Sequence, residues 1–132
     1  AAFTNYIGSN AVFIDKPLAL RGAGADRTAV VIDGGGDARG LAIAYTANSA
    51  YGFRIENLTI TNGRAPYRGG AILLNPGNAT WTATVQNCVL AHNTVFWAAE
   101  GTATNAQGGA ISMVFATSGN AGLTVSDCLI QT

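Results

Sequence analysis

The chain is poor in charged side chains. Lysine, arginine, aspartate and glutamate make up 11% of its 132 residues, against about 25% in an ordinary soluble domain. Seven basic and seven acidic residues give a net charge of zero. Proteins that bind nucleic acid or anionic membrane surfaces need a basic face, so neither partner is expected. A surface with so few charges must stay soluble through neutral polar side chains, attached glycan or burial in an assembly.

Long apolar runs and a disulfide framework are also missing. No stretch of about 18 apolar residues occurs, which argues against insertion of a helix into a membrane. No signal peptide is recognisable, and the chain begins with Ala1 rather than Met, as expected of a mature, trimmed or partial sequence. Two cysteines, Cys88 and Cys128, are too few for a disulfide scaffold and lack the spacing of a metal site. No metal or cofactor is therefore expected.

Helix signals are nearly absent, and short strands are predicted instead. Seventeen glycines and many Val, Ile and Thr residues oppose long helices. Short apolar–x–apolar triplets bounded by Gly, Asn or Asp are typical of strands, with the outer residues of each triplet inside and the middle residue outside. With 48% hydrophobic residues, one domain with a real core is expected. The triplets lie at residues 12–14, 18–20, 30–32, 41–43, 53–55, 58–60, 72–74, 84–89, 111–113, 123–125 and 128–130.

Two short phrases recur in the same order along the chain. GGAI at residues 69–72 recurs at 108–111, and FRIENLTI at 53–60 is echoed at 83–90 and 123–130. Such repetition indicates a coiled architecture in which each turn adds one strand to each of several parallel sheets. The first predicted column of strands is 18–20, 58–60, 88–90 and 128–130. The second is 40–43, 70–73 and 109–112, and the third is 53–55, 83–85 and 123–125.

Polar residues and glycines are predicted to form the corners between these columns. Asn and Asp tolerate left-handed backbone, so Asn57, Asn87 and Asp127 are expected to stack as a short ladder. Leu58, Cys88 and Cys128, which follow them, are expected in the core. The glycine pairs before each Ala-Ile are expected to supply positive φ or close backbone approach at another corner; they are Gly69, Gly70, Gly108 and Gly109.

Several phrases resemble those of a known group of families. VFIDKPLALRGAG, VVIDGGG, FRIENLTITNG and GGAI resemble right-handed parallel β-helix repeats over roughly residues 12–130. They are most similar to the GGAI repeats of polymorphic outer-membrane proteins and related secreted adhesins, and more distantly to the pectate-lyase-like superfamily. The resemblance implies an all-β fold, a right-handed parallel β-helix (solenoid) of about three to four coils with open ends. It leaves function open, because this fold hosts lyases, hydrolases, adhesins and fibre proteins alike.

One candidate ligand site lies in the phrase IDGGGDARG. Asp33, Asp37 and Arg39 would hold Ca²⁺ and a uronate if the chain works as the β-helix lyases do. Calcium needs six to eight oxygen ligands and only two carboxylates are local, so an ordinary turn is the preferred interpretation. His92, the only histidine, lacks the acidic and nucleophilic partners that catalysis requires. No catalytic residue is assigned, and the chain is not expected to be an enzyme.

A second candidate surface combines arginine and aromatic side chains. Aromatic faces stack on sugar rings, so these residues would form a sugar-binding patch if they lie together. The alternative is that they cover loops or fill an interface between protomers. The residues are Arg54, Arg64, Arg68 and Tyr67, extended by Tyr51, Trp81, Phe96 and Trp97.

The sequence contains candidate residues for two kinds of covalent modification. Cys88 and Cys128 share a column one turn apart, where in-register strands place residues about 4.8 Å apart. This spacing allows a disulfide, but both side chains point the same way, and a stacked pair of buried thiols is preferred. Of two N-glycosylation sequons, Asn78 in a loop is a better acceptor than Asn57 in the ladder. A glycan is therefore one candidate partner.

The ends of such a repeat are expected to be open. No capping helix pattern is visible, and the sequence stops at Thr132 directly after a column strand. Uncovered sheet edges pair with other strands. The chain is therefore expected to be a piece of a longer repeat protein, or a subunit that pairs head to tail with copies of itself into a filament. Residues 1–11 are predicted to cross a junction or complete a neighbour's coil, and residues 12–132 to form the β-helix domain.

The sequence favours a non-enzymatic structural or adhesive module, located outside the cell or on its surface. The alternative is a pectate-lyase-like enzyme or a polysaccharide-binding module. A groove where carboxylates and arginines converge would favour this alternative, and a flat Thr/Ala/Ser face the structural role. Ice binding would need a flat outward threonine row, but Thr59, Thr84 and Thr124 do not form a long regular array.

Overall fold

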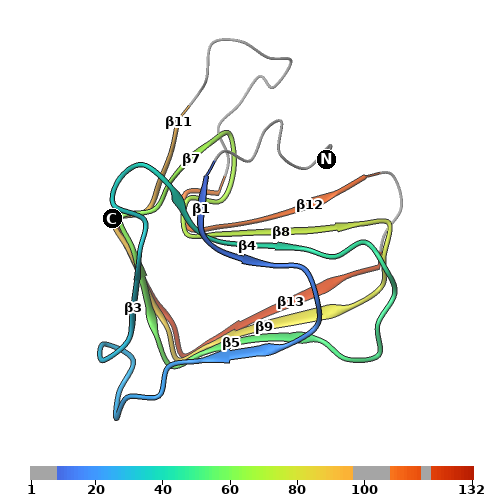
Figure 1. Ribbon diagram of the computed structural model, residues 1–132, viewed down its shortest axis with the longest axis horizontal. Helices are drawn as coiled ribbons and strands as arrows, with labels where there is room; N and C mark the ends of the chain where they lie inside the picture. Colours follow the sequence, from blue (N-terminus) through green and yellow to red (C-terminus); the bar gives the residue numbers. More distant parts are fainter. Residues whose placement is uncertain (1–8, 97–107, 117–119) are drawn as a thin grey trace.

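The computed structural model describes residues 9–96, 108–116 and 120–132, and within them the chain forms strands and no helix (Figure 1). No helix that could span a membrane is found in this part of the chain. The strands are β1 (Asn10–Ile14), β2 (Ala19–Arg21), β3 (Val31–Asp33), β4 (Arg39–Ala44), β5 (Phe53–Glu56), β6 (Thr59–Thr61), β7 (Arg64–Pro66), β8 (Ile72–Gly77), β9 (Thr82–Gln86), β10 (Val89–Ala91), β11 (Thr94–Phe96), β12 (Ile111–Phe115), β13 (Gly122–Ser126) and β14 (Leu129–Gln131).

All paired strands in the described residues are parallel. Sheet A has the order β1-β4-β8-β12, sheet B β2-β5-β9-β13, and sheet C β3-β6-β10-β14, while β7 pairs with β11. The chain passes through sheets A, B and C in turn and then returns to sheet A beside the strand it made before; we call one such passage a circuit. Sheets A and B face each other, and sheet C lies between them at one side (Figure 1). The all-β class and the parallel pairing expected from the sequence are therefore confirmed.

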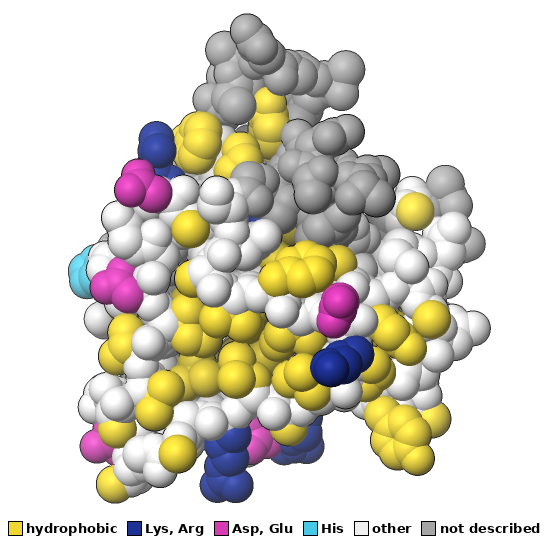
Figure 2. Space-filling model, viewed as in Figure 1, with side chains coloured by type: hydrophobic (Ala, Val, Ile, Leu, Met, Phe, Trp, Pro, Cys, Tyr) yellow, Lys and Arg dark blue, Asp and Glu magenta, His cyan; other side chains and the backbone are white. Residues whose placement is uncertain are grey.

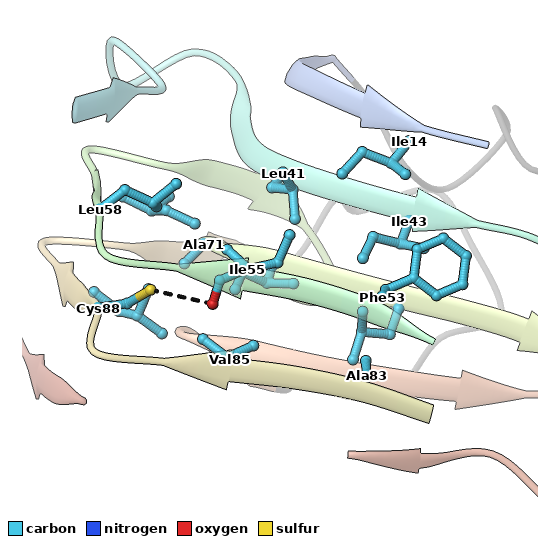
Figure 3. Close-up of a cluster of buried hydrophobic side chains, with 14 of the residues drawn as sticks. Ile14, Leu41, Ile43, Phe53, Ile55, Leu58, Ala71, Ala83, Val85 and Cys88 are labelled. Carbon is cyan, nitrogen blue, oxygen red and sulfur yellow. Dashed lines mark hydrogen bonds between the residues drawn. The ribbon is translucent and has the colours of Figure 1, made fainter. Parts of the chain in front are cut away.

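The core lies between the three sheets. In β5, Phe53 and Ile55 are buried and Arg54 is exposed, which is the period-two alternation of a half-buried strand. Side chains from successive circuits point into the same interior (Figure 3). Each fully buried Leu, Ile or Phe contributes about 1.5–3 kcal/mol. The outward side of sheet A is apolar at its centre as well, where Ala42 and Leu73 are buried.

Inward side chains stack into six apolar columns, one member from each circuit. Within the described residues, each column has one member in each of four successive circuits, so the interior that these side chains line is apolar. The columns are Val12–Leu41–Ile72–Ile111, Ile14–Ile43–Leu74–Met113, Leu18–Phe53–Ala83–Leu123, Leu20–Ile55–Val85–Val125, Val30–Leu58–Cys88–Cys128 and Ile32–Ile60–Leu90–Ile130.

The register of the first circuit differs from the sequence alignment. Residues 18–20 were expected beside 58–60, but Leu20 pairs with Ile55, and Ile32 takes the place beside Ile60. The expected first member of that column is therefore wrong. The two phrases look alike, and the chain between Arg21 and Val31 is an enlarged corner that later circuits make with only two residues.

A second difference is a shift of one residue in sheet A. Gly40 was aligned with Gly70, but Leu41 pairs with Ile72 and Ile43 with Leu74. The alignment of Ile72 with Ile111 is correct. A one-residue slip moves a strand's inward side chains to the other face, so burial of Leu41 and Ile43 decides this register.

The first strand begins within the segment expected to precede the repeats. β1 starts at Asn10, inside the predicted N-terminal segment 1–11, and pairs with β4. Residues 1–8 of that segment lie outside the described residues.

Candidate functional site

The corner between sheets B and C carries an amide ladder. Asn57, Asn87 and Asp127 have φ angles of 54°, 51° and 53°, in the left-handed region that Asn and Asp tolerate. The Nδ2 of Asn87 donates to the Oδ1 of Asn57 at 3.0 Å, and the Nδ2 of Asn57 donates to the carbonyl oxygens of Gly22 and Gly24 at 2.9 and 3.2 Å. The ladder joins the first three circuits. Asp127 occupies the equivalent position in the last circuit, where its side chain has no amide N–H to donate.

A second corner of the same kind, which was not predicted from the sequence, follows the strands of sheet C. Asn62 and His92, which follow sheet C strands, have φ angles of 52° and 56°. Asn62 donates through Nδ2 to Oδ1 of Asp33 at 3.1 Å, and the N–H of Gly35 donates to the same oxygen at 2.8 Å. The Gly35 bond, and after it the Asn62 bond, lowers the pKa of Asp33. The signal in the sequence was the polar residue one position after each Ile-Thr or Leu-Ala pair, at Asn62 and His92.

The two glycine pairs combine two different backbone requirements. Gly69 and Gly108 have φ angles of 61° and 64°, which a residue with a Cβ adopts only at a cost. Gly70 instead lies against neighbouring backbone, because a Cβ built there would be 2.5 Å from the carbonyl oxygens of Gly109 and Thr94. The first glycine of the phrase supplies the turn and the second the close approach between circuits.

Arg39 is a buried cation that binds the backbone of this corner. Its Nε donates to the carbonyl of Gly69 at 2.7 Å, Nη2 to the carbonyl of Arg68 at 2.9 Å, and Nη1 to Oδ1 of Asn10 at 2.7 Å. Burial lowers its pKa to about 10. Arg39 has no exposed surface, so it cannot contact a ligand beside Asp33 and Asp37, which are exposed.

The structure thus separates the residues of the candidate calcium and uronate site, for which an ordinary turn was the preferred interpretation. Asp33 is engaged by Asn62 and Gly35, as described above, while the Arg39 guanidinium is inside the protein. Among the described residues, no group of three or more His, Cys, Asp or Glu side chains is placed to hold a metal ion.

A polar trough runs beside the amide ladder. It has a volume of about 420 Å³ and is lined by Arg21, Gly24, Ala25, Glu56, Asn57, Gln86 and Asn87. Glu56 accepts a hydrogen bond from Nε of Arg54 at 2.5 Å, and its other oxygen lies 3.9 Å from Nε of Arg21. Both arginine side chains are largely exposed, so these ion pairs contribute little to stability. The trough presents guanidinium, carboxylate and amide groups to solvent.

The arginine and aromatic residues that were candidates for a sugar-binding patch do not lie together. Trp81 is 1% exposed, its Nε1 donates to the carbonyl of Tyr45 at 2.8 Å, and its ring centroid lies 4.8 Å from that of Phe53. Tyr51 is 80% exposed. Arg64 stacks on Phe96 at 4.1 Å in the β7–β11 pair, a cation–π contact.

The remaining members of this candidate patch are dispersed as well. Arg54 belongs to sheet B beside the polar trough, Tyr67 is buried, and Arg68 is half-buried with its carbonyl bound by Arg39. Trp97 lies outside the described residues. Because Trp81 fills the core, its aromatic side chain serves the packing of the interior and does not form a surface that binds sugar.

The two cysteines are free thiols in adjacent circuits. Cys88 is buried and Cys128 half-buried; their sulfurs lie 3.2 Å from the carbonyl oxygen of Gln86 and 3.1 Å from that of Ser126. Figure 3 shows Cys88 also directed at the carbonyl of Ile55. Burial is the main cause that raises the pKa of the Cys88 thiol.

The thiols are expected to differ in reactivity. In the native protein Cys128 should react with a thiol reagent at pH 8 at least about 100-fold faster than Cys88, because a buried neutral thiol reacts only after local opening. Because the pKa of Cys88 is raised in the folded protein, the contribution of this thiol to the free energy of unfolding is fully present below the unfolded thiol pKa of about 8.5. This contribution decreases at higher pH. Mass spectrometry of labelled peptides measures both rates, with unfolded protein as the control. Equal native rates would contradict the buried position of Cys88.

The two sequons differ in accessibility. The Asn57 amide is engaged in the ladder, whereas Asn78 is exposed just after β8. The three threonines considered for ice binding are split between sheets. Thr84 pairs with Thr124 in sheet B. Thr59 lies in sheet C instead, where its hydroxyl donates to the carbonyl of Arg27, so the three threonines do not form one row.

The edges of the three sheets leave inward side chains uncovered. Val125 and Ile130, in the last circuit, are 41% and 53% exposed, although Val85 and Leu90 in the same columns are buried. At the opposite end, apolar side chains gather over the centre of the face that carries the first circuit (Figure 2).

Comparison with protein-family models, curated proteins and solved structures finds no match for the chain.

Proposed function

We propose that the chain is a right-handed parallel β-helix of four circuits that acts as a non-enzymatic structural or adhesive module and associates end to end. The observation that carries this proposal is the exposure of Val125 and Ile130 at the edge of the apolar interior between the sheets, where their partners in the preceding circuit are buried. The six continuous columns support the helical arrangement, since each circuit places the same positions inside.

The backbone at the sheet edges supports the same proposal. Among the strands that the structure describes, β1, β2 and β3 are the outer strands of sheets A, B and C on one side, and β12, β13 and β14 on the other. The outer strand of a sheet can serve as a template for pairing with another strand. Because all three sheets are parallel, one edge of each is complementary to its opposite edge, and end-to-end association would satisfy three edges together.

The low charge of the chain supports a place in an assembly outside or on the surface of a cell. With 14 charged residues among 132, the surface has few of the like charges that keep proteins apart. The resemblance to β-helix repeats of secreted adhesins adds to this proposal.

End-to-end association predicts a specific effect of Ile130→Glu. Ile130 faces the interior of the last circuit, so a second molecule would bury the introduced carboxylate among apolar side chains and raise the dissociation constant at least about 100-fold. Sedimentation velocity over a range of protein concentrations measures this, and electron microscopy of the wild type shows whether filaments form.

The matched control for this experiment is Leu129→Glu. Leu129 precedes Ile130 on β14, is similarly exposed, and points to the outside of sheet C. It should leave association nearly unchanged, and both variants should keep the wild-type circular dichroism spectrum. A wild-type protein that stays monomeric at every concentration, or two variants with equal effects, would contradict the proposal.

A second candidate function is polysaccharide binding, which the polar trough supports. Its guanidinium, carboxylate and amide groups offer both donors and acceptors to hydroxyl groups. The support is weaker, because Arg54 and Arg21 already pair with Glu56 and none of the lining residues is aromatic.

A further inference from the structure

The uncovered interior of the last circuit is bounded by strands on three sides. Val125 from β13 and Ile130 from β14 contribute exposed apolar surface, and β12 closes the third side. A single strand, helix or loop would satisfy only one of these edges. A partner that covers all three must itself bring three parallel strands around an apolar centre. Within the described residues, the first circuit of this chain is such an element.

We infer that the occupant of this edge is a second copy of the chain in one register, with β1 of the second copy on β12, β2 on β13 and β3 on β14. This inference rests on the proposed end-to-end association and adds to it the identity of the partner and the pairing. In this register Leu20 of the second copy covers Val125 and Ile32 covers Ile130, which continues columns that are apolar in every circuit.

Charge at the corner agrees with this register. In sheet B, Arg21 pairs with Glu56, and the same row of paired residues continues through Gln86 to Ser126 in the last circuit. Arg21 of the second copy would therefore lie on Ser126, next to the exposed carboxylate of Asp127. Opposite charges that meet at the edge of an interface favour one orientation over others.

The enlarged corner of the first circuit does not obstruct this contact. The chain between β2 and β3 projects outward, away from the centre of the molecule (Figure 1). It is held against the outside of later circuits, since Nη1 of Arg27 donates to the carbonyl of Asp127 at 2.9 Å and Asn57 binds the carbonyl of Gly24. The inward residues of the first circuit, such as Val30, stay at the open face and are only partly buried.

A cross-linking experiment tests the register directly. In the inferred contact, position 30 of the second copy stacks on Cys128 at the strand spacing of about 4.8 Å. In one molecule the same two positions are three strand spacings apart, or about 14 Å. A Val30→Cys variant treated with a bis-thiosulfonate reagent of about 5 Å span should therefore form covalent dimers and larger species, with position 30 joined to Cys128 in the cross-linked peptides.

The control is Ala47→Cys, on an exposed loop after β4 that lies outside the inferred contact. It should give less than a tenth of the cross-linked product of Val30→Cys at equal concentration, and wild-type protein should give as little. If Val30→Cys gives no more product than Ala47→Cys while sedimentation still shows association, the register is wrong but the proposed function stands. If sedimentation shows only monomer as well, both are wrong.

Discussion

Gly70→Ala is expected to destabilise the protein by about 3 kcal/mol, because a Cβ at this position would lie 2.5 Å from the carbonyl oxygens of both Gly109 and Thr94. Backbone on two sides cannot move aside as a flexible side chain can, so the circuits themselves must separate. Urea denaturation monitored by circular dichroism measures the loss in the free energy of unfolding.

Gly109→Ala is the matched control, since Gly109 holds the same place in the second GGAI phrase. Its added Cβ would be 3.4 Å from the carbonyl oxygen of Asn93, an ordinary contact, so the expected loss is below about 1 kcal/mol. Similar losses in the two variants would show that the phrase acts through backbone flexibility rather than through close approach of the circuits.

Trp81→Ala is expected to cost about 3–5 kcal/mol, as other large-to-small changes of buried aromatic residues do. The side chain is fully buried against Phe53, and its indole N–H is bound to the carbonyl of Tyr45. Trp81→Phe should cost less, about 1–3 kcal/mol, because it keeps the ring but removes the donor from a carbonyl inside the protein.

Tyr51→Ala serves as the control for Trp81, because both aromatic residues were candidates for one sugar-binding patch. Tyr51 is 80% exposed, so its removal should change the free energy of unfolding by no more than about 0.5 kcal/mol. Thermal unfolding of the three variants measures the differences. A small loss for Trp81→Ala would mean that this side chain does not hold the core together.

Much of the fold could be predicted from local pattern alone. The alternation of apolar and polar residues in 53–60 predicts which side chains face inward, and the Asn or Asp in the middle of each phrase marks a backbone of positive φ, as at Asn57 and Asn87. These properties depend on side-chain period and on turn chemistry, which act within a few residues. Short apolar triplets without helical spacing likewise sufficed to predict an all-β chain.

The pairing of the first circuit could not be predicted in the same way. Leu18–Ala19–Leu20 and Val30–Val31–Ile32 are equally good matches to Leu58–Thr59–Ile60, and only the three-dimensional path of the enlarged corner decides between them. The one-residue shift at Gly40 has a different origin. The alignment matched the glycines of the two phrases, whereas the burial of Leu41 and Ile43 on the inward face sets the register.

Some features of the candidate site could likewise be predicted from the sequence, and others depend on the tertiary structure. Glycine pairs, the Asn ladder and stacked cysteines could be located from their repetition in the sequence, because each position recurs once per circuit. Whether a charged or aromatic side chain faces solvent was decided by tertiary structure: Arg39 looked like a ligand-binding residue and lies fully buried on backbone carbonyls, and Trp81 looked like a binding platform and fills the core. The sequence thus determined the period, the class and the corners, since these follow from neighbouring residues. The register, the burial of Arg39 and Trp81 and the open apolar edge at Val125 and Ile130 arise only when residues some 30 positions apart are brought side by side.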